Sequence, residues 1–197
     1  MDTISIIKNR RSIRKYKEQP VEKDKIKELL NMAMRAPSGK NRQPWEFVVL
    51  QNGPKQELID ILHNKARKLK KEGEDVGSCL SSVRTMRQAP VLILFYNPFS
   101  DLERTELDEY EWSVDTQSIG AAIENLLLAA TEMGLGSLWI CDIFLAEKEI
   151  SNWLDREDEL VAGVALGHSA EDPSASPRKD LEDNVTWMGE DKLEDEL

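Results

Sequence analysis

Hydrophobic residues recur along the chain at the spacings of helices and strands. Between Glu22 and Pro37 the apolar side chains follow an i, i+3, i+4, i+7 spacing, which places them on one face of a helix. Pro37 ends this pattern because it lacks an amide hydrogen and its ring clashes with the preceding turn. A second helix is predicted from Pro54 to Lys71, and its basic end suits a helix C-terminus. Shorter helices are expected over residues 3–9, 79–87 and 146–154.

Uninterrupted apolar runs of strand length alternate with these helices. The run from Pro90 to Tyr96 contains no polar interruption, which is typical of a strand covered on both faces. Residues 137–141 are expected to form a second central strand, and residues 46–51 and 160–166 further buried strands. Alternating helices and buried strands favour an α/β sandwich of the α+β class, in which helices cover a sheet.

The longest helical pattern covers residues 115–133 and is apolar on nearly all sides, so we expect this helix to be buried. Small residues at Gly120, Ala121 and Ala129 permit a second helix to approach closely. Before this helix, residues 97–114 are expected to form an acidic loop that carries three aromatic residues. Those aromatics either anchor the loop or form a lid over a site, because long loops in compact domains are often functional.

Length and composition indicate one globular domain. We place the domain at residues 1–189 and expect an acidic, frayed tail at 190–197. The net charge of −11 and the isoelectric point near 4.8 argue against nucleic acid or an anionic membrane as the main partner. No apolar run has the length of a membrane span and no leader pattern is visible, so a cytoplasmic location is expected. The two cysteines and two histidines show no metal-ligand spacing, so no metal site is predicted.

Three arginines and a serine fall within one short segment near the N-terminus. Arg10, Arg11 and Arg14 each present a planar fork of donors that suits phosphate, and Ser12 adds a hydroxyl. Arg10 and Arg14 lie four residues apart, so they share a face if the segment is helical or enters a helix. A solvated basic turn is the ordinary alternative for an isolated cluster of this kind.

Four separated blocks resemble, in order and spacing, the signatures of the FMN-dependent nitroreductase family. These blocks are RRSIR at 10–14, APSGKNRQPW at 36–45, MGLGSLWI at 133–140, and VALG at 164–167 followed by PRK at 177–179. The resemblance covers nearly the full chain. Two places depart from the family pattern: Cys141-Asp142 replaces a common small-residue pair, and His168-Ser169 stands where many members have Tyr-Pro.

The resemblance implies a homodimer with a central, mostly antiparallel sheet covered by helices and with one FMN at each of two interface sites. It assigns Arg10, Ser12 and Arg178 to the phosphate and ribityl end, with Arg11 in the same segment. Arg14 would face the pyrimidine edge of the flavin, near N1 and O2. A guanidinium at that edge would stabilise the negative charge that the flavin gains on reduction.

The other implied cofactor contacts come from two further stretches. Pro37, Ser38 and Asn41 would come from the partner subunit and meet the flavin ring, and Trp139, Ile140 and Cys141 would supply backbone groups near N5 and O4. Simpler roles remain for some of these residues and for a neighbour. A turn cap is the simpler alternative for Ser38, Trp45 fits a core position better than a cofactor platform, and Cys141 fits a buried small hydrophobic residue.

The expected function is an NAD(P)H-dependent FMN oxidoreductase. NADH or NADPH would deliver hydride to flavin N5 and leave, and an electron-poor acceptor such as a nitroaromatic or a quinone would then enter the same cleft. This ping-pong scheme requires no amino-acid nucleophile. Alternatives on the same scaffold are reductive dehalogenation, oxygen-dependent flavin chemistry, or a flavin-binding or sensing protein with little turnover.

Overall fold

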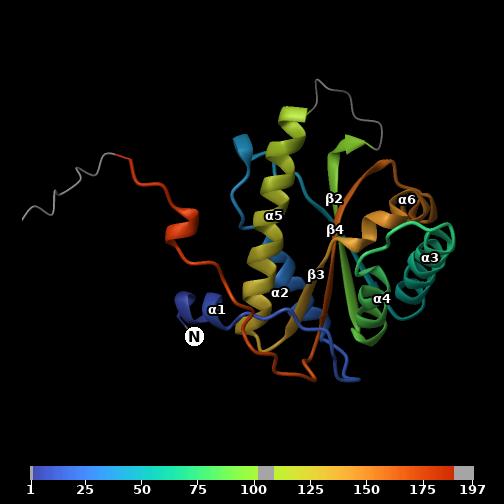
Figure 1. The fold of residues 1–197 in the computed structure, drawn as a ribbon, viewed down its shortest axis with the longest axis horizontal. Helices are drawn as coiled ribbons and strands as arrows, with labels where there is room; N and C mark the ends of the chain where they lie inside the picture. Colours follow the sequence, from blue (N-terminus) through green and yellow to red (C-terminus); the bar gives the residue numbers. More distant parts are fainter. Residues whose placement is uncertain (1, 102–108, 189–197) are drawn as a thin grey trace, which may run out of the picture.

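A four-stranded antiparallel sheet forms the centre of the computed structural model, which describes residues 2–101 and 109–188 (Figure 1). The strand order is β1-β2-β4-β3, and every neighbouring pair is antiparallel. The strands are β1 (Glu46–Gln51), β2 (Val91–Asp101), β3 (Gly136–Ile140) and β4 (Asp158–Gly167). The predicted α+β sandwich with an antiparallel sheet is therefore confirmed.

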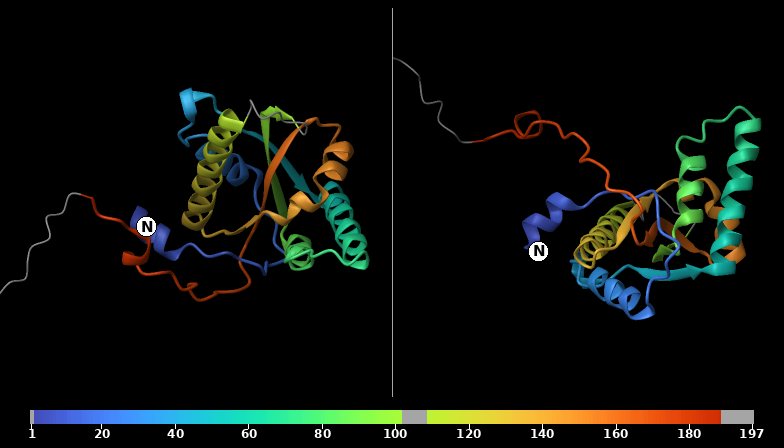
Figure 2. Two further views of the ribbon diagram at one scale, coloured as in Figure 1. Left: turned by 45° about the horizontal axis from the view of Figure 1, so that its top comes forward. Right: turned by 90° about the horizontal axis from the view of Figure 1, so that it is seen from below.

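Helices cover both faces of the sheet, as the two further views show (Figure 2). One face carries α2 (Lys23–Ala33) and α5 (Glu109–Glu132), and the other carries α3 (Asn52–Lys71), α4 (Cys79–Gln88) and α6 (Glu147–Leu154). The remaining helix, α1 (Thr3–Asn9), packs against α5, and its N-cap is Asp2, which accepts the amide hydrogen of Ser5 at 3.1 Å. Short 3₁₀ turns lie at η1 (Gly39–Asn41), η3 (Asp142–Ala146) and η4 (Glu182–Asn184).

Alternation along β2 divides the hydrophobic core into two layers. Leu92 and Leu94 point into the layer under α3 and α4, whereas Ile93 and Phe95 point into the layer under α2 and α5. Full burial of such side chains contributes about 1.5–3 kcal/mol each. The apolar run predicted as a central strand is therefore central, because both of its faces are covered. Trp45 is buried in the α2 and α5 layer, so its expected core position is also confirmed.

Two expectations about the strands and their connections were wrong. Residues 137–141 were predicted as a central strand, but β3 lies at the edge of the sheet beside β4. Its apolar character comes from the helices above and below it rather than from a strand on each side. Residues 97–114 were predicted as a loop, yet β2 continues to Asp101 and α5 begins at Glu109. The intervening residues 102–108, like residues 1 and 189–197 with the predicted tail, lie outside the described residues.

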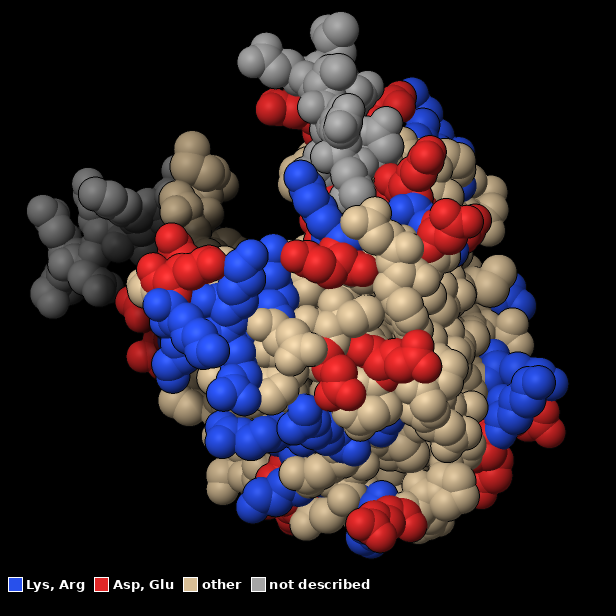
Figure 3. Space-filling model, turned by 90° about the vertical axis from the view of Figure 1, so that its right-hand side faces the viewer, with Lys and Arg blue, Asp and Glu red and all other residues tan. Residues whose placement is uncertain are grey.

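The surface mixes charges of both signs on the side that carries α3, α4 and α6 (Figure 3). The last turn of α3 holds Lys68, Lys70 and Lys71, which confirms the basic helix end expected from the sequence. Nearby, Lys65 forms an ion pair with Glu149 at 2.6 Å. Among residues 2–101 and 109–188, no helix is long and apolar enough to cross a membrane.

Candidate functional site

The arginine segment is extended rather than helical. Helix α1 ends at Asn9, and Arg10 is its C-cap residue, so the condition under which Arg10 and Arg14 would share a helix face is not met. The segment instead runs beside β3, where the Ile13 amide donates to the Ser137 carbonyl at 2.9 Å. This pairing covers the start of the exposed edge of β3 and places the arginine segment beside it.

A second set of contacts fixes the segment to the chain that leaves β4. The Tyr16 ring is buried, its hydroxyl lies 2.9 Å from the Ile13 carbonyl and 3.3 Å from the Ala165 carbonyl of β4, and the Lys17 amide donates to the His168 carbonyl at 2.9 Å. Burial, followed by the nearby Glu171 carboxylate, raises the pKa of Tyr16, so this hydroxyl stays protonated. Glu171 accepts the amide hydrogens of Arg14 and Lys15 on one carboxylate oxygen, at 2.5 and 3.1 Å. The backbone around Arg14 is therefore held from both sides.

A pocket of about 300 Å³, here called the arginine pocket, lies between this segment and residues 173–178. Its polar lining includes Arg10, Arg11, Ser12, Arg14 and Arg178. The guanidinium groups have different partners: that of Arg10 lies 3.3 Å from the Glu124 carboxylate, whereas those of Arg14 and Arg178 donate to nearby backbone carbonyls. The cluster gives a strongly cationic pocket in a chain of net charge −11, and this charge suits a phosphate group.

A second pocket, here called the β3 pocket, shares Arg14 with the arginine pocket. It has a volume of about 250 Å³, and Trp139, Ile140 and Cys141 form one wall. Because the Ser137 carbonyl points outward to Ile13, the alternation of the strand directs the backbone groups of Trp139 and Cys141 toward the same free edge. This edge can therefore donate and accept hydrogen bonds to a planar molecule in the pocket.

Helix α4 forms the opposite wall of the β3 pocket, and none of its residues was among the predicted site residues. Hydroxyl-bearing residues line the pocket on this side: Ser78, which is the N-cap of α4, and Ser81, Ser82 and Thr85. Ser78 and Ser82 both donate to one oxygen of Asp142, at 2.8 Å in the case of Ser78, and so join the two walls. The i, i+3, i+4, i+7 spacing of these hydroxyls was the available signal for a polar helix face.

Cys141 is exposed, so the expectation of a buried small residue was wrong. The cysteine follows the last residue of the edge strand, where its side chain reaches the β3 pocket instead of the core. Partial burial and the adjacent Asp142 carboxylate raise the pKa of the Cys141 thiol above its usual value. The other cysteine, Cys79, is fully buried, and burial raises its pKa to about 11.

The structure does not bring Pro37, Ser38 and Asn41 to either pocket. They lie on the loop between α2 and β1, which packs on the N-terminal half of α5. Pro37 and Asn41 are exposed, and Ser38 is half-buried, with its hydroxyl accepting the Gln43 amide hydrogen at 3.0 Å. Ser38 precedes the 3₁₀ turn η1 but makes no side-chain capping hydrogen bond to it, and its hydroxyl instead joins the two ends of the loop. Any flavin contact by these residues would be made elsewhere than in the pockets of the same chain.

Comparison with known proteins identifies the family. The model of the Nitroreductase family matches residues 7–168. The chain belongs to the nitroreductase family. YfhC of Bacillus subtilis (strain 168), provisionally named an NAD(P)H nitroreductase, is 27% identical over 186 residues, which cover 93% of this chain and 92% of YfhC. The recognition based on the four sequence blocks is thus confirmed.

Solved structures of nitroreductase-like proteins have the same architecture. A provisionally named nitroreductase from Desulfovibrio desulfuricans, determined in complex with FMN, has 27% identity and a TM-score of 0.74, with 95% of this chain and 97% of that chain covered. A BluB-like flavoprotein from Clostridium difficile 630 has 27% identity and a TM-score of 0.76, with 95% and 99% covered. The nitroreductase-like fold is therefore shown over nearly the whole chain.

Proposed function

We propose that this member of the nitroreductase family binds FMN and passes reducing equivalents from NADH or NADPH to an electron-poor small molecule, such as a nitroaromatic or a quinone. The observation that carries the proposal is the arrangement of two pockets around Arg14, one strongly cationic and one beside the free edge of β3. Family membership and the names of relatives, including a 4-nitrobenzoate reductase of Pseudomonas putida with 24% identity, support this reaction class.

The residues of the arginine pocket fit the phosphate end of FMN. A dianionic phosphate requires fixed cations and hydrogen-bond donors, which Arg10, Arg11, Arg178 and Ser12 supply in one pocket. The free edge of β3 and the pocket beside it fit the flavin ring, because Trp139 and Cys141 direct backbone groups there. Arg14 would then lie at the pyrimidine edge of the ring.

FMN, when bound, supplies the hydride-transfer chemistry at N5. The chain itself holds and orients the cofactor: Arg14 provides a fixed positive charge where negative charge develops, and this arrangement needs no reorganisation during the reaction. Backbone N–H groups at the β3 edge would donate hydrogen bonds to the ring without ionising, because an amide N–H is not an acid near neutral pH. The walls formed by α4 and β3 limit what enters beside the ring. No side-chain nucleophile or general base is required by this scheme.

We also propose that the chain works as a homodimer with shared FMN sites, in the cytoplasm. Several large apolar side chains are exposed on α1 and on the C-terminal segment, which extends away from the body of the subunit (Figures 1 and 2). They are Ile4, Ile7, Leu181, Trp187 and Met188. Exposed apolar groups of this kind favour burial against a second copy. The separate position of the loop with Pro37, Ser38 and Asn41 agrees with a contribution across the interface.

A visible spectrum of the purified protein tests the cofactor and the reaction together. Oxidised flavin absorbs strongly, and anaerobic addition of NADH or NADPH should bleach it, with nitroaromatic or quinone restoring the colour. Flavin that is bound but not bleached would favour the alternative of a flavin-binding protein with little turnover. Purified protein that takes up no FMN from solution would contradict the proposal.

Mixed dimers test the shared site. A Ser38→Ala/Asn41→Ala chain co-expressed with an Arg10→Ala/Arg14→Ala chain should form heterodimers with one intact site and one doubly damaged site. These should hold about one FMN per two chains, whereas each parent homodimer should retain FMN poorly. Equal, poor retention by the heterodimer and both parents, or a flavin-saturated wild-type monomer, would show that the site is not shared.

A further inference from the structure

The loop between α2 and β1 adopts an unfavourable backbone conformation. Lys40, Asn41 and Gln43 all have positive φ angles, of 51°, 55° and 53°. Residues other than glycine rarely adopt this left-handed conformation. Where they do, contacts from the surrounding structure hold the backbone in it. Gly39 is also constrained, because a Cβ atom there would lie 2.3 Å from the Val114 side chain on α5. Contacts with the rest of the protein must therefore stabilise the backbone conformation of this loop.

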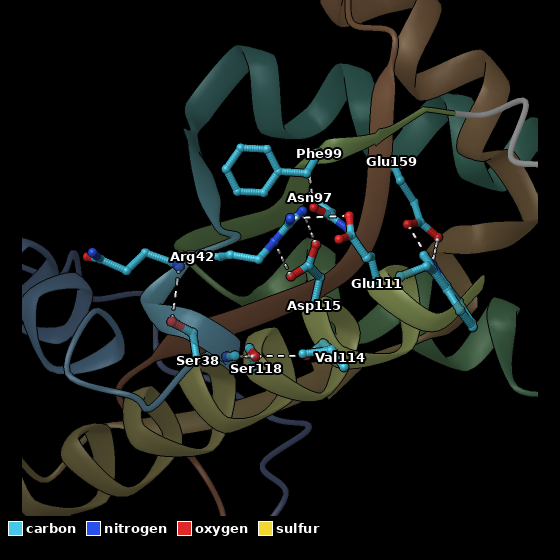
Figure 4. A network of polar contacts seen from close by, with 12 residues as sticks. Ser38, Arg42, Asn97, Phe99, Glu111, Val114, Asp115, Ser118 and Glu159 are labelled. Carbon is cyan, nitrogen blue, oxygen red and sulfur yellow. Dashed lines mark hydrogen bonds and ion pairs between the residues drawn. The ribbon is translucent and has the colours of Figure 1, made fainter. Parts of the chain in front are cut away.

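The main external contact of this loop is the side chain of Arg42 (Figure 4). Its Nε and Nη2 donate to the two carboxylate oxygens of Asp115 at 3.2 and 3.0 Å, a bidentate arrangement. Its Nη1 donates to Glu111 at 3.2 Å, and the guanidinium carbon lies 4.8 Å from the centre of the Phe99 ring. Asp115 is almost completely buried, so this contact is desolvated on the carboxylate side.

One weaker hydrogen bond attaches the loop to the same stretch of α5. The Gly39 amide donates to the Ser118 hydroxyl at 3.4 Å, and that hydroxyl in turn donates to the Val114 carbonyl at 2.8 Å. The partners of the loop on α5 run from Glu111 to Ser118, about two turns, with those of Arg42 at one end and that of Gly39 at the other. Between the two attachments, the exposed side chain of Asn41 faces away from the core, and Ser38 precedes the turn.

We infer that Arg42 is a positioning residue for the flavin site: its fork to Asp115 holds the loop in its left-handed conformation, so that Ser38 and Asn41 are presented in a fixed geometry to the FMN of a second subunit. This inference rests on the proposed function, because it takes these two residues to be flavin contacts. Arg42 lines neither the arginine pocket nor the β3 pocket, but it lines a separate pocket of about 220 Å³ together with Gly39 and Asp115. Arg42 would affect FMN binding through the loop, without contacting the cofactor.

The chain offers a matched control for a purely structural effect. Arg156 makes the same set of contacts elsewhere: a bidentate pair with Asp158 at 2.7 and 2.5 Å, an ion pair with Glu46 at 2.6 Å, and a guanidinium carbon 4.3 Å from the centre of the Tyr96 ring. It lies between α6 and β4 and holds no part of the loop. Loss of either arginine should lower stability, but only loss of Arg42 should affect FMN.

The first measurement is FMN affinity, obtained by titrating apoprotein and following the quenching of flavin fluorescence. Arg42→Met should raise the FMN Kd at least tenfold, and Arg42→Lys should give a smaller increase because it keeps the charge but loses the fork. Arg156→Met should remain within twofold of wild type, although thermal melting should show that it is destabilised. An Arg42→Met protein with wild-type Kd, or an Arg156→Met protein with the same loss, would overturn the inference.

A double-mutant cycle tests whether Arg42 changes FMN affinity through Ser38 and Asn41 or independently of them. In a Ser38→Ala/Asn41→Ala background, Arg42→Met should change the FMN Kd by less than twofold, because the residues through which it acts are absent. An undiminished tenfold effect in that background would overturn the inference. If Arg42→Met does not fold, Arg42→Lys carries the same cycle with a smaller expected effect. Wild-type protein that binds no FMN would instead refute the proposed function, so the two failures are distinguishable.

Discussion

Removal of the Glu171 carboxylate should weaken FMN binding even though it removes a negative charge near a proposed phosphate site. Glu171 accepts the backbone amides of Arg14 and Lys15 at 2.5 and 3.1 Å, and it is half-buried. Hydrogen bonds to charged groups contribute about 1.5–3 kcal/mol each. In the Glu171→Ala protein, water takes over part of the hydrogen bonding to the two amides, so we expect the stabilisation of the arginine segment to fall by about 2 kcal/mol in total.

This free energy translates into two measurable effects. For a chain of this size, about 2 kcal/mol corresponds to a decrease in Tm of about 4–8 °C. If the whole loss falls on the arrangement of the arginine segment that binds FMN, the Kd rises about 30-fold. Glu171→Gln keeps an acceptor oxygen but loses the charge, so roughly half of the stabilisation should remain, with a Kd increase of about fivefold.

The sign of the change in affinity separates positioning from simple electrostatics. If Glu171 acts only as a repulsive charge, both variants should bind FMN more tightly than wild type. The exposed neighbour Asp172 provides the control, since Asp172→Ala removes the same charge without disturbing the amides of Arg14 and Lys15. FMN titrations by fluorescence quenching and thermal melts of the apoproteins supply the data. Wild-type or tighter FMN binding by Glu171→Ala would refute the reasoning.

Further predictions concern the two pockets. Arg10→Ala or Arg178→Ala should each reduce FMN affinity by about 1.5–3 kcal/mol, measured by equilibrium dialysis; full retention of FMN by both variants would contradict their place at the phosphate. Arg14→Ala should lower the flavin midpoint potential, because it removes a positive charge at the pyrimidine edge, and a spectroelectrochemical titration that gives no shift or an upward shift would contradict this position. Cys141 should react slowly with iodoacetamide near neutral pH because partial burial and Asp142 raise its pKa. The reaction should accelerate as the pH rises and in Asp142→Asn, and FMN should protect the thiol; alkylation that is indifferent to FMN would place the ring outside the β3 pocket.

The elements that depend on local pattern were predictable from the sequence. The helical face of α2 and the apolar run of β2 are set by the spacing of their own side chains, and the structure places both as predicted. The edge position of β3 was not predictable in this way. Strand order depends on which strands pair, and an apolar five-residue strand reads the same at an edge covered by helices as in the centre of a sheet.

The candidate site also contains residues that the sequence reveals and residues that it does not. Its chemistry-bearing residues, such as Arg10 and Arg14, stand out because a cluster of guanidiniums is conspicuous in an acidic chain. The residues that hold them in place do not stand out. Glu171 is one of 37 acidic residues in the chain. Its carboxylate meets the Arg14 amide only because the segment after β4 pairs with the arginine segment. No local spacing encodes a contact across more than 150 residues.

Two of the segments that carry proposed flavin contacts are thus irregular in backbone and are fixed by partners remote in sequence. Glu171 holds the backbone at Arg14, and Asp115 holds Arg42 and with it the loop around Ser38. An irregular segment that ordered only on binding would subtract its ordering entropy from FMN affinity, whereas a segment fixed by folding does not. The polar contacts outside the pockets therefore serve binding by completing the ordering before the cofactor arrives. It follows that substitutions which touch no cofactor atom should change FMN affinity here, and that residues lining the pockets are an incomplete guide to the site.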